Sequence, residues 1–332
     1  MPFKILMYHE PEDILKEAFA GSDIQIKFGT QPTEAAMCAD IADCDALVLF
    51  EQPENGFNRK IIEAAKQLKL IARFGAGYET VDVDCASEYG IYVSNTPRVN
   101  NISVAEGILA MMVGCNRNTQ KVVERFRRLK GDYPFFNSDS SARGHDLYGK
   151  TLGLVGCGSI GQTVAEMAVF GLHMKVIGYD PYLKDFPAHI EKMDSRDQVF
   201  QNADYVSLHL PSMESTRRSV GMSDFQMMKP TAYFINAARG NIVREEELIC
   251  ALRNKVITGA ALDVYAQEPI AQSSYELFDL DHVYLLPHCT AFTVESHERG
   301  LRSMAQSLVE AANGQKPTFR VNEPVNPRLF KK

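Results

Sequence analysis

Residues 151–161 read TLGLVGCGSIG, and this stretch decides the fold. A short apolar run leads into three glycines, and the amphipathic stretch 162–170 follows. A G-x-G-x-x-G pattern is weak by itself, but between a strand and a helix it is typical of a dinucleotide-binding turn. Gly156 allows the tight turn, Gly158 lets a pyrophosphate approach the backbone, and Gly161 lets helix and strand pack closely. The sequence therefore predicts a phosphate site at a helix N-terminus.

An acidic residue follows at the distance that a dinucleotide site requires. Asp180 ends the next apolar run, 175–179, and lies 19 residues beyond Gly161. A carboxylate there accepts hydrogen bonds from the adenosine ribose and repels a 2′-phosphate, which favours NAD(H) over NADP(H). The alternative is a structural glycine turn beside a solvated Asp. The spacing and the context together favour NAD as the cofactor.

Outward from this turn, short β-branched runs alternate with helical patterns along most of the chain. The runs predicted as strands are 4–8, 24–28, 46–50, 69–74, 151–155, 175–179, 205–210, 232–236, 258–262 and 283–286. This alternation predicts βαβ units and parallel sheets that are covered on both faces. Because the runs form two blocks, we expect an α/β protein with two doubly wound parallel-sheet domains.

The domain boundaries follow from two predicted helices. An apolar helix over 101–115 separates the two blocks, and a final helix over about 294–313 follows the last strand. If that last helix returns to the first block, one domain is discontinuous. We therefore expect one domain from residues 1–100 and 299–332, and a continuous one from residues 101–298.

Length and composition exclude several classes of protein. The chain has 332 residues, 45% hydrophobic and 23% charged, with a formal net charge of −7. The negative charge argues against a nucleic-acid partner. No apolar stretch approaches the roughly 20 residues of a membrane helix, so no membrane partner is expected. Seven scattered cysteines without a C-x-x-C pair favour a reducing, cytoplasmic location.

Three polar residues follow successive predicted strands, where ligands collect in open α/β sheets. Arg239 suits a carboxylate, and Glu268 with His288 suits acid–base chemistry because the anion orients the ring and favours its protonated form. Taken alone, each has an ordinary structural reading as a surface charge or an exposed histidine. His282 and His288 are poorly spaced for a metal, so no metal site is predicted.

With these segments in place, the whole chain resembles the D-isomer-specific 2-hydroxyacid dehydrogenases, nearest the phosphoglycerate dehydrogenase and hydroxypyruvate reductase branch. Besides the segments above, the resemblance rests on RFGAGYETVD (73–82), NTP (95–97), SVAE (103–106) and SLHLP (207–211). It implies a Rossmann NAD-binding domain, a flavodoxin-like substrate domain and a cleft between them. It also implies a homodimer formed through the cofactor domain.

The resemblance assigns roles residue by residue. It implies that His288 is the proton donor and acceptor, Glu268 its hydrogen-bond partner and Arg239 the carboxylate clamp. The implied cofactor contacts, beyond the glycine turn, are Ser159, Ile160, Asp180, Thr96, Ala237, Arg239, Asp263 and His288. Backbone N–H groups of Gly75, Ala76 and Gly77 are implied donors to the substrate carboxylate, together with Arg239.

The function implied is reversible reduction of a 2-keto acid, a small-molecule substrate, to a D-2-hydroxy acid. One alternative is an NAD(H)-sensing, corepressor-like regulator on the same scaffold. A second is a formate- or phosphite-type dehydrogenase, although formate enzymes usually carry Gln at the position of Glu268. The roles of Arg73 and Arg98 stay open between substrate binding and structure.

Overall fold

The computed structural model describes residues 2–50, 56–130 and 143–330. The chain divides into two compact units, which we call unit 1 (Met1–Asn100 with Thr293–Lys332) and unit 2 (Asn101–Phe292). The predicted second boundary, between residues 298 and 299, instead falls inside helix α11 (Val294–Ala312). Because α11 is one continuous helix that packs on unit 1, the boundary precedes its first turn.

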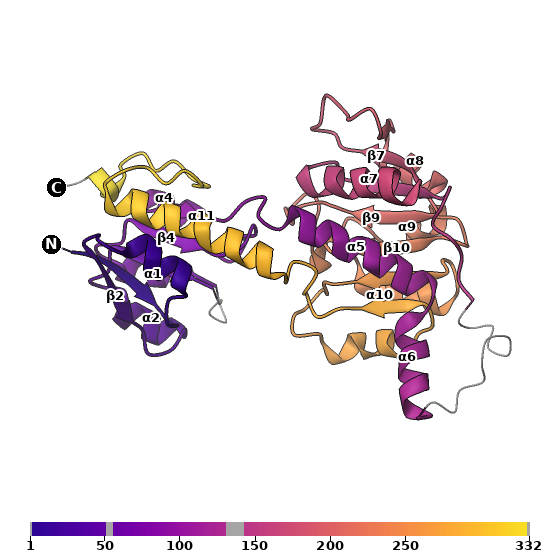
Figure 1. Ribbon diagram of the computed structural model, residues 1–332, viewed down its shortest axis with the longest axis horizontal. Coiled ribbons are helices and arrows are strands. Elements are labelled where there is room, and N and C mark those ends of the chain that lie inside the picture. Colours follow the sequence, from indigo (N-terminus) through magenta and orange to yellow (C-terminus); the bar gives the residue numbers. More distant parts are fainter. Residues whose placement is uncertain (1, 51–55, 131–142, 331–332) are drawn as a thin grey trace. The chain divides into compact units, whose positions relative to one another are not determined.

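Unit 1 is built on a parallel five-stranded sheet in the order β2-β1-β3-β4-β5. Its strands are β1 (Phe3–Met7), β2 (Ile24–Phe28), β3 (Ala46–Leu49), β4 (Leu70–Arg73) and β5 (Tyr92–Ser94). Helices α1 (Asp13–Phe19) and α11 cover one face, and α2 (Glu34–Asp40), α3 (Arg59–Ala64) and α4 (Val83–Glu88) cover the other (Figure 1). This strand order is that of the flavodoxin-like fold.

The alternation of side chains along the strands explains why both faces of this sheet are covered. Ile5 and Met7 of β1 belong to the core under α1 and α11, whereas Leu6 belongs to the core under α2, α3 and α4. Successive side chains of a strand point to opposite faces, so a strand that is apolar throughout requires a layer on each side.

Unit 2 is built on a parallel seven-stranded sheet in the order β12-β11-β10-β9-β6-β7-β8. Its strands are β6 (Thr151–Val155), β7 (Lys175–Tyr179), β8 (Glu191–Lys192), β9 (Tyr205–Leu208), β10 (Tyr233–Asn236), β11 (Gly259–Leu262) and β12 (Val283–Leu285). Counted from β6, the first six strands have the order 3-2-1-4-5-6 of a dinucleotide-binding fold.

Helices cover both faces of this second sheet as well. One face carries α5 (Asn101–Asn116) and α7 (Ser159–Leu172), and the other carries α8 (Arg196–Asn202), α9 (Met222–Met227) and α10 (Glu245–Arg253) (Figure 1). Helix α6 (Thr119–Arg128) and the 3-10 helices η2 (Gly240–Ile242), η3 (Gln272–Phe278) and η4 (Arg328–Phe330, in unit 1) complete the described elements. The two doubly wound parallel sheets predicted from the sequence are therefore present.

Two strands were missed, and α5 was found almost to the residue. β5 has three residues and β8 only two exposed ones, too few to show an alternating pattern. Helix α5 starts at Asn101 as predicted and is largely buried; its Cys115 Sγ donates to the His282 carbonyl at 2.8 Å. The aromatic residues Tyr133, Phe135 and Phe136 of the segment after α6 lie outside the described residues.

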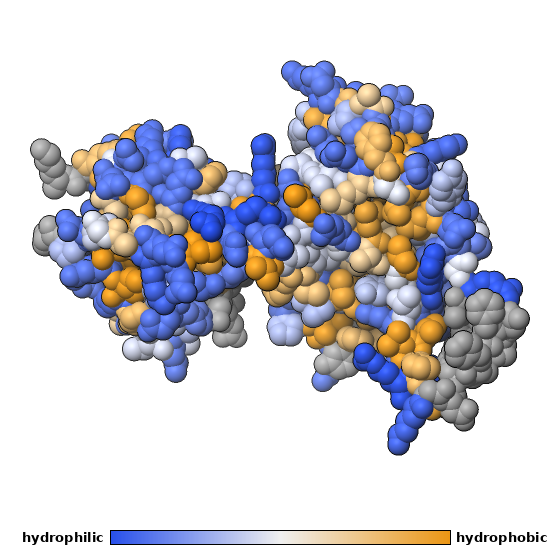
Figure 2. Space-filling view, in the orientation of Figure 1, coloured by the Kyte–Doolittle hydropathy of each residue, from blue (hydrophilic) through white to orange (hydrophobic). Residues whose placement is uncertain are grey.

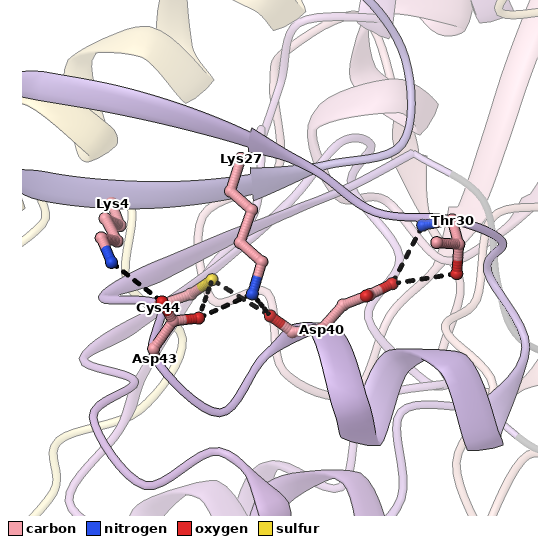
Figure 3. Close-up of polar contacts among 6 residues, drawn as sticks. All are labelled: Lys4, Lys27, Thr30, Asp40, Asp43 and Cys44. Carbon is pink, nitrogen blue, oxygen red and sulfur yellow. Dashed lines mark hydrogen bonds and ion pairs between the residues drawn. The ribbon is translucent and has the colours of Figure 1, made fainter.

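A polar network ties the edge of the unit 1 sheet to the turn before β3 (Figure 3). Asp43 accepts from Lys27 Nζ at 2.6 Å and from Lys4 Nζ at 2.8 Å. Lys27 also donates to the Asp40 carbonyl at 2.6 Å, and Asp40 Oδ2 accepts from the Thr30 amide at 3.0 Å. The hydrogen bonds from the two lysines hold the pKa of Asp43 well below its usual value. The network joins neighbouring strands at a partly exposed edge.

The described chain also bears on cysteines, metals and membranes. All seven cysteines are free thiols. Within residues 2–50, 56–130 and 143–330, His, Cys, Asp and Glu nowhere cluster in threes suited to a metal ion. Across those same ranges, each helix is too short or too polar to span a membrane.

Candidate active site

The glycine-rich turn forms a cradle at the carboxyl end of β6. Gly156 has a φ of 94°, and a Cβ there would lie 2.6 Å from the His209 carbonyl oxygen. A Cβ on Gly161 would lie 2.6 Å from the Gly156 carbonyl oxygen, so helix and turn are in direct contact. Around Gly158 no described atom comes within 4 Å of such a Cβ, which leaves that backbone open. These are the three properties that a pyrophosphate-binding turn requires.

The cradle lies where the strand order of unit 2 reverses, between β6 and β9. Gly158 is the N-cap of α7, and Ser159 and Ile160 form its first turn. The first N–H groups of a helix lack acceptors within the helix and carry the positive end of its dipole. Ligands of open α/β sheets bind at such a reversal point. The turn therefore fits the phosphates of a dinucleotide.

Asp180 lies directly beside this turn. Its Oδ2 accepts from the Cys157 amide at 2.9 Å, and its Oδ1 accepts from the amides of Tyr182 and Leu183 at 2.9 and 3.2 Å. The carboxylate is thus held in place from both sides by backbone N–H groups. It is the acidic group that a ribose would meet next to the cradle.

Arg239 leaves a turn that is shaped by an asparagine. Asn236, the buried last residue of β10, accepts from the Ala238 amide and donates to the Arg239 carbonyl, both at 3.0 Å. Arg239 itself is half-buried, and its guanidinium donates to the Ala238 carbonyl at 2.7 Å. Ala237, expected near the cofactor, lies half-buried in the same turn.

Glu268 and His288, which the sequence predicts to be an acid–base pair, are in direct contact. His288 Nδ1 lies 2.6 Å from Glu268 Oε2, and the other carboxylate oxygen accepts from the Tyr265 amide at 3.1 Å. The two side chains are 50% and 37% exposed, so solvent and ligands reach the pair. With Nδ1 engaged by Glu268, Nε2 is the other ring nitrogen.

The pair shifts the pKa values of both partners in opposite directions. The hydrogen bond with Glu268 raises the pKa of His288 above its usual 6.5, against the opposing effect of burial. Burial alone would raise the pKa of Glu268, but the hydrogen bond and charge of His288 lower it below its usual 4.5. The arrangement therefore favours an imidazolium beside a carboxylate.

Asp263 holds the histidine turn. Its carboxylate accepts from the Cys289 amide at 2.7 Å, from the Thr290 amide at 3.0 Å and from the Thr290 hydroxyl at 2.6 Å. His288 has a φ of 56°, an uncommon conformation for a non-glycine residue. Asp263 was expected to contact the cofactor, yet both of its oxygens are engaged with this turn. Residues in such backbone conformations persist where surrounding contacts hold them.

The remaining predicted residues lie in unit 1: Gly75, Ala76 and Gly77 in the loop after β4, and Thr96 just after β5. The Gly75 amide donates to the Thr96 hydroxyl at 2.9 Å, and the Gly75 carbonyl accepts from the Thr96 amide at 3.0 Å. Asn95 Nδ2 donates to the Ala76 carbonyl at 2.7 Å. The Gly75 amide is therefore engaged by Thr96, so the donors that this loop offers an anion are Ala76 and Gly77.

Arg73 and Arg98, whose roles the sequence leaves undecided, lie in different surroundings. The Arg73 guanidinium donates to the carbonyls of Leu49, Phe50 and Phe74, which ties β4 to β3 and holds the start of the glycine loop. Arg98 has a φ of 62°, where glycine is the ordinary residue.

The sequence did not single out several residues that hydrogen-bond to the loops of the candidate site. Asn236 ends β10 and bonds to the turn that follows it, whereas Asn95 follows β5 and bonds to the loop after β4. An Asn at a strand end is a usable signal for such a contact. Glu245, a buried carboxylate at the start of α10, accepts from the Ala266 amide at 2.9 Å. Nothing in its sequence context distinguishes it from the two acidic residues that follow it.

The chain is similar to known proteins over most of its length. Residues 109–290 match the family model of the D-isomer specific 2-hydroxyacid dehydrogenase NAD binding domain. The glyoxylate reductase of Korarchaeum cryptofilum is 34% identical over 298 residues, which cover 89% of this chain and 87% of the relative. The D-3-phosphoglycerate dehydrogenase of Methanocaldococcus jannaschii is 34% identical over 321 residues, 96% of this chain. The chain spans only 59% of that relative's length.

Among solved structures, a glyoxylate reductase from Paecilomyes thermophila superposes with a TM-score of 0.83 at 26% identity. The superposition covers 96% of this chain and 98% of the other. The matched family model lies within unit 2, where the glycine cradle, Asp180 and the Glu268–His288 pair are found. The chain therefore belongs to the D-isomer specific 2-hydroxyacid dehydrogenase family, and unit 2 is its NAD-binding domain.

Proposed function

We propose that the protein interconverts a 2-keto acid and a D-2-hydroxy acid with NAD(H) as the cofactor. The observation that carries this proposal is the 2.6 Å contact between His288 and Glu268, which lies in the same unit as the glycine cradle. The reported relatives bear enzyme names, which supports catalysis over a regulatory role.

Each residue has a distinct part in the proposed reaction. When bound, the nicotinamide donates the hydride to C2 of the keto acid or accepts it from the hydroxy acid. In reduction, Nε2 of protonated His288 gives its proton to the alkoxide that develops at C2, while Nδ1 stays on Glu268. The fixed charge of Arg239 binds the carboxylate and stabilises the developing negative charge.

The roles of the other predicted residues are part of the same proposal. Gly156, Gly158, Ser159, Ile160 and Gly161 form the proposed phosphate site, and Asp180 is the proposed ribose acceptor. The Gly156 amide donates to the Tyr179 carbonyl at 2.9 Å, so the proposed donors to the phosphates are amides of the residues that follow it. In unit 1, which we propose to be the substrate domain, Ala76 and Gly77 offer N–H groups to a carboxylate. Thr96 supports this loop through Gly75.

A panel of 2-keto acids assayed with NADH tests the proposal. We expect oxidation of NADH with at least one of them, and a fall of kcat by roughly 10²- to 10⁴-fold in His288→Gln. NADH affinity, measured by fluorescence titration, stays close to wild type because the cradle is untouched. The matched control is His145→Gln, an exposed histidine of unit 2, which leaves kcat unchanged. Equal loss of turnover and NADH binding in His288→Gln contradicts the role assigned to His288.

We also propose that the protein forms a homodimer through α6. None of the residues of α6 is buried, although Val123 and Phe126 are large, apolar and 44% and 48% exposed. Figure 2 shows hydrophobic surface over this helix beside hydrophilic side chains. Beside it, Thr119, Gln120, Val123, Glu124, Arg127 and Tyr284 line a groove of about 390 Å³. Apolar surface of this kind usually marks an interface.

Light scattering after gel filtration tests the dimer. Wild type is expected at twice the mass of one chain, and Phe126→Glu at the mass of one chain. The control is Phe170→Glu on α7, which is 67% exposed but far from α6 in the sequence, and which leaves the mass unchanged. A monomeric wild type rejects this part of the proposal.

The seven free thiols support a further proposal, that the protein works in the cytoplasm.

A further inference from the structure

Tyr265 contacts the three segments that carry Arg239, Glu268 and His288. It lies in the loop after β11, three residues before Glu268, and its side chain is buried with 9% exposure. Its hydroxyl donates to the Leu286 carbonyl at 2.8 Å. Leu286 continues β12 and stands two residues before His288, so this bond fixes the backbone that leads into the histidine turn.

The backbone of Tyr265 holds the partner of the histidine. Its N–H donates to Glu268 Oε1 at 3.1 Å, while Glu268 Oε2 faces His288 Nδ1 at 2.6 Å. The two oxygens of one carboxylate thus link the Tyr265 backbone with the His288 ring. A rotation of the carboxylate would lengthen one of the two contacts.

The carbonyl of Tyr265 lies against the Arg239 turn. Gly240 follows Arg239 directly, and a Cβ at Gly240 would overlap the Tyr265 carbonyl group. The two backbones are therefore in van der Waals contact without an intervening side chain. Tyr265 reaches the Arg239 turn through its carbonyl, Glu268 through its amide and the His288 turn through its hydroxyl.

We propose that Tyr265 is a positioning residue, and that its hydroxyl sets the distance between Glu268 and His288. The inference rests on the proposed function, because it concerns the pair that acts there. Glu268 is held by the loop after β11, whereas His288 is held by the chain that leaves β12. The bond from the Tyr265 hydroxyl to Leu286 joins these two segments close to the pair. Asp263 joins the same two segments just beyond His288, through Cys289 and Thr290, whereas the Tyr265 hydroxyl joins them just before it. Without the hydroxyl, the chain that leads into His288 is less firmly placed against the Glu268 loop, and the hydrogen bond between the two side chains weakens.

The test substitutes Tyr265→Phe, which removes only the hydroxyl, and follows the His288 ring by NMR titration of the whole protein without substrate. The charged groups near the ring are Glu268, Asp263 and Arg239, and all three stay in this variant. A weaker bond to Glu268 lowers the midpoint of the His288 titration. The ring signal is assigned by its loss in His288→Gln. Because the titration needs no turnover, it remains decisive even if the proposed reaction is wrong.

Kinetics give a second measurement. In Tyr265→Phe we expect kcat for keto-acid reduction to fall roughly three- to tenfold, the size of one lost hydrogen bond. The alkaline limb of its pH profile moves to lower pH, while the KM for NADH is unchanged. Tyr205→Phe is the matched control, since Tyr205 is a buried tyrosine at the other end of the unit 2 strands. It leaves both the titration and the profile unchanged.

A second variant approaches Tyr265 from the Arg239 side. Gly240→Ala keeps the hydroxyl but displaces the Tyr265 backbone, and we expect the His288 midpoint to move in the same direction. If Tyr265→Phe does not fold, as judged by circular dichroism, Gly240→Ala tests the positioning role of Tyr265 through its backbone, and a wild-type His288 midpoint in that variant overturns the role. A folded Tyr265→Phe whose His288 titrates at the wild-type midpoint overturns the proposal, whatever its melting temperature.

Discussion

At the residue scale, the pair of His288 and Glu268 is the central feature, because the Glu268 carboxylate raises the pKa of the His288 ring. Glu268 is held by the Tyr265 amide, and it in turn holds the His288 ring at 2.6 Å. The pair is only partly buried, so its effect on stability is small and its effect on protonation is the important one.

The first prediction concerns pH. The folded-state pKa of His288 is raised, so the imidazolium is fully present at pH values below its usual 6.5 and is lost as the pH rises through the raised value. In the proposed reaction the reduction needs this proton, so kcat/KM for the keto acid is expected to fall at alkaline pH. Glu268→Gln removes the carboxylate that raises the pKa of His288, so the alkaline limb of the variant's pH profile is expected at lower pH. Its kcat is expected to fall by roughly tenfold or more. A limb at the same pH in both proteins contradicts this account.

The second prediction concerns the choice of cofactor. Asp180→Asn removes the negative charge beside the cradle but keeps a similar shape. We expect the ratio of kcat/KM with NADH to kcat/KM with NADPH to fall roughly tenfold, because a 2′-phosphate no longer meets a carboxylate. Asp185→Asn, at an exposed aspartate five residues on, is the control and leaves the ratio unchanged. An unchanged ratio in Asp180→Asn would show that the carboxylate does not discriminate.

At the scale of elements, the close approach of α5 to the histidine turn stands out. A Cβ on Gly107 would lie 2.8 Å from the Thr290 Cβ, and Thr290 is bonded to Asp263 through both its amide and its hydroxyl. A helix far from His288 in the sequence therefore packs directly on the turn that carries it. The glycine is there because no larger residue fits.

The third prediction compares two glycines in helices of the same unit. Gly107→Ala is expected to lower kcat and to destabilise the fold by roughly 1–3 kcal/mol, because the added methyl displaces Thr290. Gly171→Ala on α7 is the control, since no described atom lies within 4 Å of its Cβ. There alanine is neutral or stabilises by up to about 1 kcal/mol, as expected from helix propensity. Thermal unfolding and initial rates measure both effects; equal effects at the two sites contradict the packing argument.

At the scale of the whole molecule, the four hydrophobic clusters divide cleanly between the units. Two clusters of buried residues lie on the two faces of the unit 1 sheet, and two lie on the faces of the unit 2 sheet. Each sheet is therefore stabilised by its own pair of cores.

The fourth prediction follows from these separate cores. NADH at about 100 times its Kd is expected to stabilise unit 2 by about 2.7 kcal/mol, because it binds the folded state alone. Hydrogen exchange measured by mass spectrometry should slow over residues 151–183. The same experiment should leave β1 and β2 of unit 1 unchanged, since they belong to other cores. Equal protection of β1, β2 and residues 151–183 would show that the units do not open separately.

By itself, the sequence determined the two parallel-sheet domains and the glycine turn. It also predicted Asp180 and the set of Arg239, Glu268 and His288, of which Glu268 and His288 lie in contact. These depend on short-range features: alternation along a strand, the spacing of glycines, and polar residues just after buried runs. Such features require no knowledge of distant parts of the chain. The short strands β5 and β8 were not predicted, because an alternating strand pattern needs more than two or three residues to be recognised.

Only the tertiary structure decided what each site residue contacts. In the structure, the Gly75 amide donates to Thr96 and both carboxylate oxygens of Asp263 accept from the histidine turn. The Tyr265 hydroxyl donates to the Leu286 carbonyl. These contacts join residues about 20 or more positions apart, at ends of neighbouring strands. Hydrogen bonds act over about 3 Å, and only the packing of strands and helices brings such distant residues within that range.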